Sequence, residues 1–122
     1  MTSSPATGEL PYRPAAPLPP TDILLVQDSL LEVELTLRPL QELDPSSHIE
    51  VARDGEEALD FLLGRGSFRQ RLGAPLPRLV LLDLKLPKLD GIEVLRGVRG
   101  NPRTRMTPVV MLTSSIDPRQ LA

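Results

Sequence analysis

The chain has 122 residues, a formal net charge of −2 at pH 7, 40% hydrophobic residues and 25% charged residues. This length fits one domain with a core of its own, and the charge excludes the broad basic surface that drives nucleic-acid binding. Because cysteine is absent, disulfides, thiolate metal sites and cysteine catalysis are excluded. No apolar segment is long enough to span a membrane, and we expect a cytoplasmic protein.

Residues 1–20 differ in composition from the rest of the chain. Six prolines fall within them, at Pro5, Pro11, Pro14, Pro17, Pro19 and Pro20. Such a stretch cannot bury enough apolar surface to offset the entropy of ordering it, so the sequence predicts a flexible N-terminal arm. The alternative is that Leu10, Pro11, Tyr12 and Leu18 dock on a neighbouring chain.

Residues 21–122 alternate short apolar runs with helical patterns. Unbroken apolar runs at 23–26, 79–82 and 109–112 are typical of strands that are buried on both faces of a parallel sheet. The stretch 48–52 predicts a weaker strand at an edge. Strands that alternate with helices indicate an α/β fold in which helices wrap a parallel sheet.

Three helices are predicted between these strands. The first follows Asp28 or Ser29 as its N-cap, the second follows Asp54, and the third runs from about Gly91 to Arg99. The residues expected to face the core are Leu30, Val33, Leu37 and Leu40 in the first helix, Ala58, Leu59, Leu62 and Leu63 in the second, and Ile92, Leu95 and Val98 in the third. The polar stretch 64–77 is interpreted as a solvated connector, with an arginine-based phosphate or partner site as the alternative.

Hydrophilic side chains follow three of the predicted strands: Asp28, Asp83 and Thr113. In the flavodoxin-like strand order 2-1-3-4 the first and third strands are neighbours, so Asp28 and Asp83 share one crevice, with Thr113 beside it. Two close carboxylates repel each other unless a cation lies between them, and Mg²⁺ accepts one or two carboxylates together with several waters. A carboxylate can also attack phosphorus to form an aspartyl phosphate, which a hydroxyl such as that of Thr113 can hydrogen-bond.

Three motifs carry a resemblance to a known family: ILLVQDS at 23–29, LLDLKLPKLDG at 81–91 and VVMLTS at 109–114. In this order and spacing they resemble the receiver domain of bacterial two-component response regulators. The motifs are most similar to those of single-domain regulators that partner phytochrome-type histidine kinases. The resemblance covers about residues 22–122 and implies a flavodoxin-like (CheY-like), doubly wound parallel sheet.

The resemblance also implies roles for individual residues. Asp83 becomes the phosphoacceptor for a sensor histidine kinase, and Thr113 the hydroxyl that turns toward the phosphoryl group. Mg²⁺ is then held by Asp28, Asp83 and the backbone carbonyl of Lys85. Such a protein signals through protein contacts and is no enzyme beyond slow self-dephosphorylation. A homodimer through the face after the fourth strand, or by strand exchange, is a further expectation.

The chain departs from the family pattern in two places. Gln27 stands where the family usually has the first of two acidic residues, which is expected to weaken Mg²⁺ binding, although Gln27 could contact a metal-bound water instead. The family continues with a fifth strand, which carries a lysine for the phosphoryl group, and a last helix; neither is present in this chain. We therefore expect residues 21–122 to be a C-terminally incomplete receiver domain, truncated from a longer one.

Two other functions compete with this interpretation. A pseudo-receiver, an interaction or dimerisation module that phosphate does not switch, is favoured by Gln27 and by the missing lysine. A phosphatase of the haloacid dehalogenase type needs a second acid two residues after its nucleophile, and Lys85 occupies that place, so the sequence disfavours this enzyme. The single histidine, His48, is interpreted as a surface residue.

Overall fold

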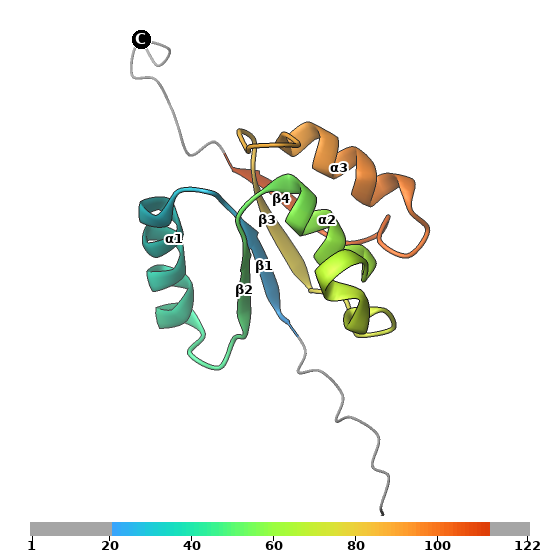
Figure 1. Ribbon diagram of the computed structural model, residues 1–122. Helices are drawn as coiled ribbons and strands as arrows, with labels where there is room; N and C mark the ends of the chain where they lie inside the picture. Colours follow the sequence, from blue (N-terminus) through green and yellow to red (C-terminus); the bar gives the residue numbers. More distant parts are fainter. Residues whose placement is uncertain (1–20, 113–122) are drawn as a thin grey trace, which may run out of the picture.

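The structure is a computed structural model that describes residues 21–112 (Figure 1). The predicted N-terminal arm, 1–20, lies outside the described residues, and so does Thr113 with the residues that follow it. Within 21–112 no helix has both the length and the apolar character needed to cross a membrane.

Four parallel strands form one sheet in the order β2-β1-β3-β4. Their bounds are Ile23–Val26 for β1, Ile49–Ala52 for β2, Leu79–Asp83 for β3 and Val109–Leu112 for β4. This order confirms the flavodoxin-like arrangement that the sequence predicted. It places β1 and β3 side by side at the centre, with all carboxyl ends at one edge of the sheet.

Helices cover both faces of the sheet. Their bounds are Leu30–Leu43 for α1, Gly55–Leu63 for α2 and Gly91–Gly100 for α3, with a short 3-10 helix, η1, at Gly66–Arg71. Helix α1 lies on one side of the sheet, and α2 and α3 lie together on the other (Figure 1). The N-caps are Ser29, Asp54 and Asp90, whose side chains each accept a hydrogen bond from a backbone N–H in the first turn.

The core consists of two apolar layers because successive strand residues point to opposite faces. On the side of α2 and α3, the buried side chains of the central strands are Leu24, Val26, Val80 and Leu82, and they pack with Leu62, Val94 and Val98 among others. On the other side Leu25 and Leu81 pack with Val33 of α1. This packing fixes the two central strands, and with them the residues at their carboxyl ends.

Two residues predicted to face the core are exposed. Ile92 is 43% exposed, and Val94 takes the buried place with Val98. The buried face of α3 therefore differs from the predicted one. Gly91, at the start of the helix, lies against the backbone of Asp83 and Leu84, where a side chain would not fit, and this contact sets which face of the helix is buried. Leu30 is 68% exposed because it begins α1 just beyond the end of the sheet.

The stretch 64–77 is more structured than a solvated connector. Phe68 of η1 packs against the core, its ring edge-on to Phe61 with the ring centroids 5.3 Å apart. The guanidinium of Arg71 lies 4.0 Å from the centre of the Phe61 ring, and partial burial lowers the pKa of Arg71 from its ordinary value. Arg65 pairs with Asp60 at 2.8 Å. Both arginines thus make structural contacts that hold the connector in place, which favours a structural role over the alternative phosphate or partner site.

Candidate functional site

Asp83 ends the central strand β3 at the carboxyl edge of the sheet. Its side chain is only 3% exposed, and its Oδ1 accepts a hydrogen bond from the backbone N–H of Lys85 at 3.2 Å. Because Val26 of β1 pairs with Leu82 of β3, the residues directly after β1 lie at the same level as Asp83. The sheet therefore brings the end of β1 to Asp83, as the sequence predicted.

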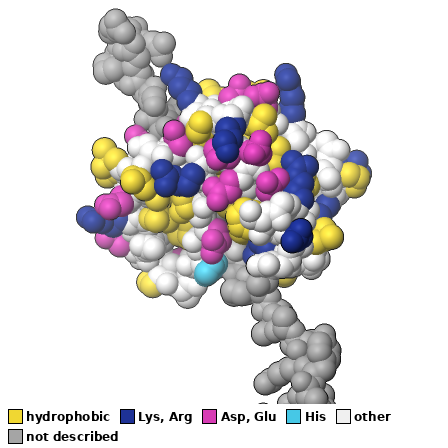
Figure 2. All heavy atoms as spheres, viewed as in Figure 1, with side chains coloured by type: hydrophobic (Ala, Val, Ile, Leu, Met, Phe, Trp, Pro, Cys, Tyr) yellow, Lys and Arg dark blue, Asp and Glu magenta, His cyan; other side chains and the backbone are white. Residues whose placement is uncertain are grey.

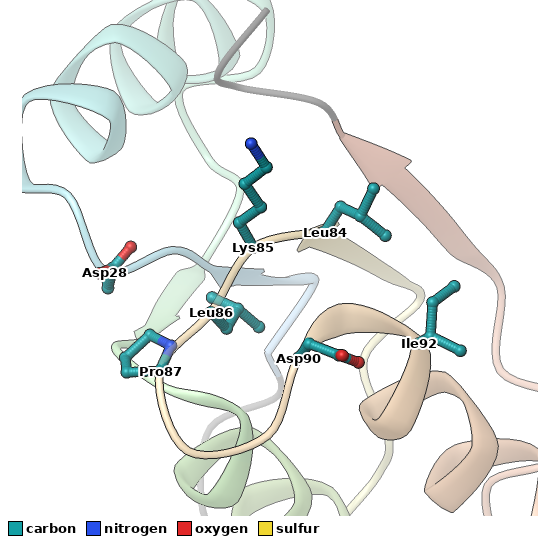
Figure 3. A pocket seen from close by; sticks show the side chains of 7 residues that line it. All are labelled: Asp28, Leu84, Lys85, Leu86, Pro87, Asp90 and Ile92. Atoms are coloured by element: carbon teal, nitrogen blue, oxygen red, sulfur yellow. The ribbon is translucent and has the colours of Figure 1, made fainter.

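Asp28 lies in the loop between β1 and α1 and lines a pocket of about 640 Å³. Figure 3 shows its carboxylate on the side that faces the loop after β3. The other lining residues are Leu84, Lys85, Leu86, Pro87, Asp90 and Ile92. A carboxylate in an open pocket at the carboxyl edge of a parallel sheet is well placed to meet a ligand.

Gln27 is 2% exposed and is part of the loop framework. Its side-chain Oε1 accepts a hydrogen bond from the backbone N–H of Ser29 at 3.1 Å, and its own backbone N–H donates to the carbonyl of Ala52 at 2.9 Å. The amide oxygen of Gln27 therefore helps to shape the loop that carries Asp28.

Asp90 also lines the pocket, but its carboxylate has a structural task. Its Oδ1 accepts from the backbone N–H of Glu93 at 2.9 Å, and the side chain of Glu93 accepts from the backbone N–H of Asp90 at 3.1 Å. This reciprocal capping box starts α3. Asp90 is therefore a structural residue at the edge of the pocket.

Two cationic side chains tie the loops around the pocket together, and no sequence pattern pointed to either of them. Arg53 donates from its Nη2 to the backbone carbonyl of Asp28 at 3.0 Å. The Nζ of Lys88 lies 3.5 Å from Asp54 at the start of α2. Lys88 has a φ of 68°, the left-handed conformation, which turns the loop after β3 back toward α2. These contacts hold Asp28 and the loop after Asp83 in a defined relation.

The donor set fits Mg²⁺. Within 21–112 there is no cluster of three or more His, Cys, Asp or Glu side chains that could hold a metal. Mg²⁺ binds through one or two carboxylates and keeps several waters. Asp28 and Asp83 are carboxylates that follow neighbouring strands at this edge of the sheet, so the residues present fit such an ion.

The comparisons with known proteins agree with this architecture. Residues 23–122 match the family model of the response regulator receiver domain. FilR2, a probable methanogenesis regulatory protein of Methanothrix harundinacea, is 46% identical over 79% of this chain and 59% of its own length. Response regulator Rcp1 of Synechocystis is 41% identical over 80% of this chain and 64% of its own length. The chain thus spans about three-fifths of these two relatives.

Solved structures give the same result. The bacteriophytochrome response regulator AtBRR superposes with a TM-score of 0.73 at 48% identity and covers 84% of this chain and 73% of its own. The phosphorylated cyanobacterial phytochrome response regulator RcpA superposes with a TM-score of 0.70 at 34% identity and covers 84% of this chain and 71% of its own. The Mn²⁺-bound form of Rcp1 superposes with a TM-score of 0.64 at 39% identity and covers 83% of this chain and 70% of its own. The chain belongs to the response regulator receiver domain family, as its three motifs predicted.

Proposed function

We propose that this chain is a phosphoacceptor response regulator that receives a phosphoryl group on Asp83 from a sensor histidine kinase. The observation that carries the proposal is the position of Asp83, which is buried at the end of the central strand, level with the start of the loop that carries Asp28. The match to phytochrome response regulators, one of them solved in a phosphorylated form, supports a phytochrome-type kinase as the partner.

In the proposed transfer an oxygen of the Asp83 carboxylate attacks the phosphorus of a phosphohistidine. A bond from phosphorus to the carboxylate oxygen forms, the phosphorus–nitrogen bond breaks, and the imidazole leaves with the electron pair. The N–H of Lys85 orients the carboxylate through its 3.2 Å hydrogen bond to Oδ1. Thr113, which lies outside the described residues, would hydrogen-bond the phosphoryl group afterwards.

Asp28, Asp83 and the backbone carbonyl of Lys85 would hold Mg²⁺ in the pocket. When it is bound, the ion neutralises charge on the transferring phosphoryl oxygens. The Mn²⁺-bound form of Rcp1 supports a divalent cation in this family. Signalling would then proceed through protein contacts without further catalysis. A homodimer through the face after β4 or by strand exchange, and a cytoplasmic location, remain predictions.

A pseudo-receiver remains the second candidate, because Gln27 removes one acidic side chain from the predicted metal site. Incubation with acetyl phosphate and Mg²⁺ followed by intact-mass analysis separates the two. A base-labile phosphoryl adduct on the 122-residue chain would support the phosphoacceptor. No adduct on a folded chain, both as it stands and when extended through the family's lysine strand, would favour the pseudo-receiver.

Gln27→Glu should tighten Mg²⁺ binding about tenfold, which corresponds to about 1.4 kcal/mol. Glutamate has almost the same shape and can still accept from the N–H of Ser29, but it adds a negative charge beside Asp28 and Asp83. Calorimetric titration with Mg²⁺ measures the change.

Gln41→Glu is the matched control, since it adds the same charge at an exposed position of α1, away from the pocket. If both variants bind Mg²⁺ with the affinity of the parent, or if the Mg²⁺ affinity of both rises by the same factor, the cation does not lie next to Gln27.

A further inference from the structure

The peptide unit between Asp28 and Ser29 is hydrogen-bonded at both of its ends. Its carbonyl, which belongs to Asp28, accepts from the Nη2 of Arg53 at 3.0 Å. Its N–H, which belongs to Ser29, donates to the side-chain Oε1 of Gln27 at 3.1 Å. Because a peptide unit is planar, two hydrogen bonds on opposite edges fix its orientation. Arg53 and Gln27 together therefore set the direction in which the backbone leaves Asp28.

The backbone on either side of this peptide unit is held as well. The N–H of Gln27 donates to the carbonyl of Ala52 at the end of β2, and Ser29 is the N-cap of α1. Asp28 lies between these two anchored residues, and its carboxylate lines the pocket (Figure 3). Since the backbone is fixed before and after Asp28, the freedom left to the carboxylate is rotation about its own side-chain bonds.

Arg53 is itself anchored by the start of α2. Its backbone N–H donates to the Oε1 of Glu57 at 2.7 Å, and the N–H of Glu57 donates to the Oδ1 of the N-cap Asp54 at 2.7 Å. Three ion pairs join residues within 21–112, and Arg53 takes part in none of them. Within this part of the chain, its guanidinium is thus engaged with a backbone carbonyl of the loop after β1 and with no carboxylate.

We propose that Arg53 is a positioning residue for Mg²⁺ binding, which holds the carbonyl of Asp28 and so keeps the Asp28 carboxylate in place before the ion binds. The inference rests on the Mg²⁺ site of the proposed function. A carboxylate that is already in place loses less conformational entropy when it binds an ion, which raises the affinity without additional charge. In this way geometry offsets part of the negative charge that is missing at Gln27.

A role in positioning and a role as a charge predict opposite effects when Arg53 is lost. A cation close to Asp28 repels Mg²⁺. Figure 2 shows Asp and Glu side chains gathered near the centre of the face that carries α2, with Lys and Arg side chains between them. If Arg53 acted only as a charge, its removal would make this surface more negative and would tighten Mg²⁺ binding. If Arg53 positions Asp28, its removal weakens Mg²⁺ binding.

Arg53→Met removes the charge and the hydrogen-bond donor but keeps most of the aliphatic side chain. In calorimetric titration of the full 122-residue chain, the variant should bind Mg²⁺ about fivefold more weakly than the parent, the effect expected for one lost hydrogen bond. Arg53→Lys keeps a charged donor and should return the affinity to within about twofold of the parent. Arg69→Met removes an exposed arginine of η1 and should leave the affinity unchanged.

Hydrogen exchange of the Ser29 N–H in the metal-free protein is a second readout, which needs neither Mg²⁺ nor phosphorylation. Without Arg53 the peptide unit can turn away from Gln27, so this N–H should exchange about fivefold faster in Arg53→Met. In Arg53→Lys and Arg69→Met it should exchange as in the parent. Both arginines are exposed, so thermal unfolding should be almost the same for all variants.

An Arg53→Met variant that binds Mg²⁺ as tightly as the parent, or more tightly, would overturn the proposal. So would an unchanged exchange rate at Ser29, or a loss of thermal stability with parental Mg²⁺ affinity, which would indicate a purely structural arginine. Failure of the proposed function is distinguishable from these results. If the parent binds no Mg²⁺, the proposed metal site is wrong and the inference fails with it. If the parent binds Mg²⁺ with the expected dependence on Arg53 but forms no adduct on Asp83, the positioning role stands and the phosphoacceptor does not.

Discussion

Asp83→Asn should abolish phosphorylation by acetyl phosphate while leaving the fold intact. The amide has no oxygen nucleophile comparable to a carboxylate, so no acyl phosphate can form at this position. The substitution keeps the shape of the side chain, and its oxygen can still accept from the N–H of Lys85, which limits the structural cost at this buried site. Intact-mass analysis of the parent and the variant after the same incubation with Mg²⁺ measures the difference.

Asp90→Asn is the control for this experiment. It makes the same chemical change at a carboxylate that lines the pocket with Asp28, but Asp90 caps α3 and asparagine caps a helix about as well as aspartate. We expect Asp90→Asn to be labelled like the parent. An adduct that persists on Asp83→Asn, or that disappears from Asp90→Asn as well, would mean that Asp83 is not the phosphoacceptor.

The strands and their order could be predicted because each central strand is an unbroken apolar run that packs on both faces. In a run such as 79–82 polar and apolar residues do not alternate, which is typical of a strand buried on both faces. The three motifs indicated which strands are neighbours. The ends of β1 and β3 were predicted at neighbouring places because parallel strands end at one edge of the sheet. The cap at Asp54 was predictable for a similar reason, since capping depends on the local sequence.

The contacts between loops could not be predicted because they depend on tertiary placement. Nothing in the spacing of Arg53 indicates that it reaches the backbone of Asp28, 25 residues earlier in the chain. The hydrogen bond from Ser29 to Gln27 likewise appears only once the loop is folded. The prediction that Ile92 faces the core was also wrong. The spacing of apolar residues indicates a helix, but it does not show which residue of that helix must lie close to another segment's backbone.

That close approach occurs at Gly91. A Cβ atom at this position would lie 2.6 Å from the backbone oxygen of Asp83 and 2.8 Å from the Cα of Leu84. Both contacts are with backbone, which cannot rotate away as the end of a side chain can. The N–H of Gly91 also donates to the carbonyl of Leu84 at 2.9 Å, so the first residue of α3 is tied to the segment directly after Asp83.

Gly91→Ala should therefore destabilise the fold by about 1–3 kcal/mol, the cost of overpacking a closely fitted site, and should slow phosphorylation of Asp83. To admit the methyl group, either the end of β3 or the start of α3 must move, and a shift of the β3 end displaces the Asp83 carboxylate relative to Asp28. Denaturant unfolding gives the stability, and the rate of adduct formation from acetyl phosphate gives the functional effect.

Gly100→Ala provides the comparison, because a Cβ there would meet no atom of a neighbouring segment within 4 Å among the described residues, and the position ends the same helix. It should be neutral or stabilising by up to about 1 kcal/mol, since alanine favours helix more than glycine does, and phosphorylation should be unchanged. Equal stability of the two variants would show that the contact at Gly91 yields easily. A Gly91→Ala variant that is less stable but labelled at the parental rate would separate the fold from the site, and Asp83 would then be held in position by the sheet alone.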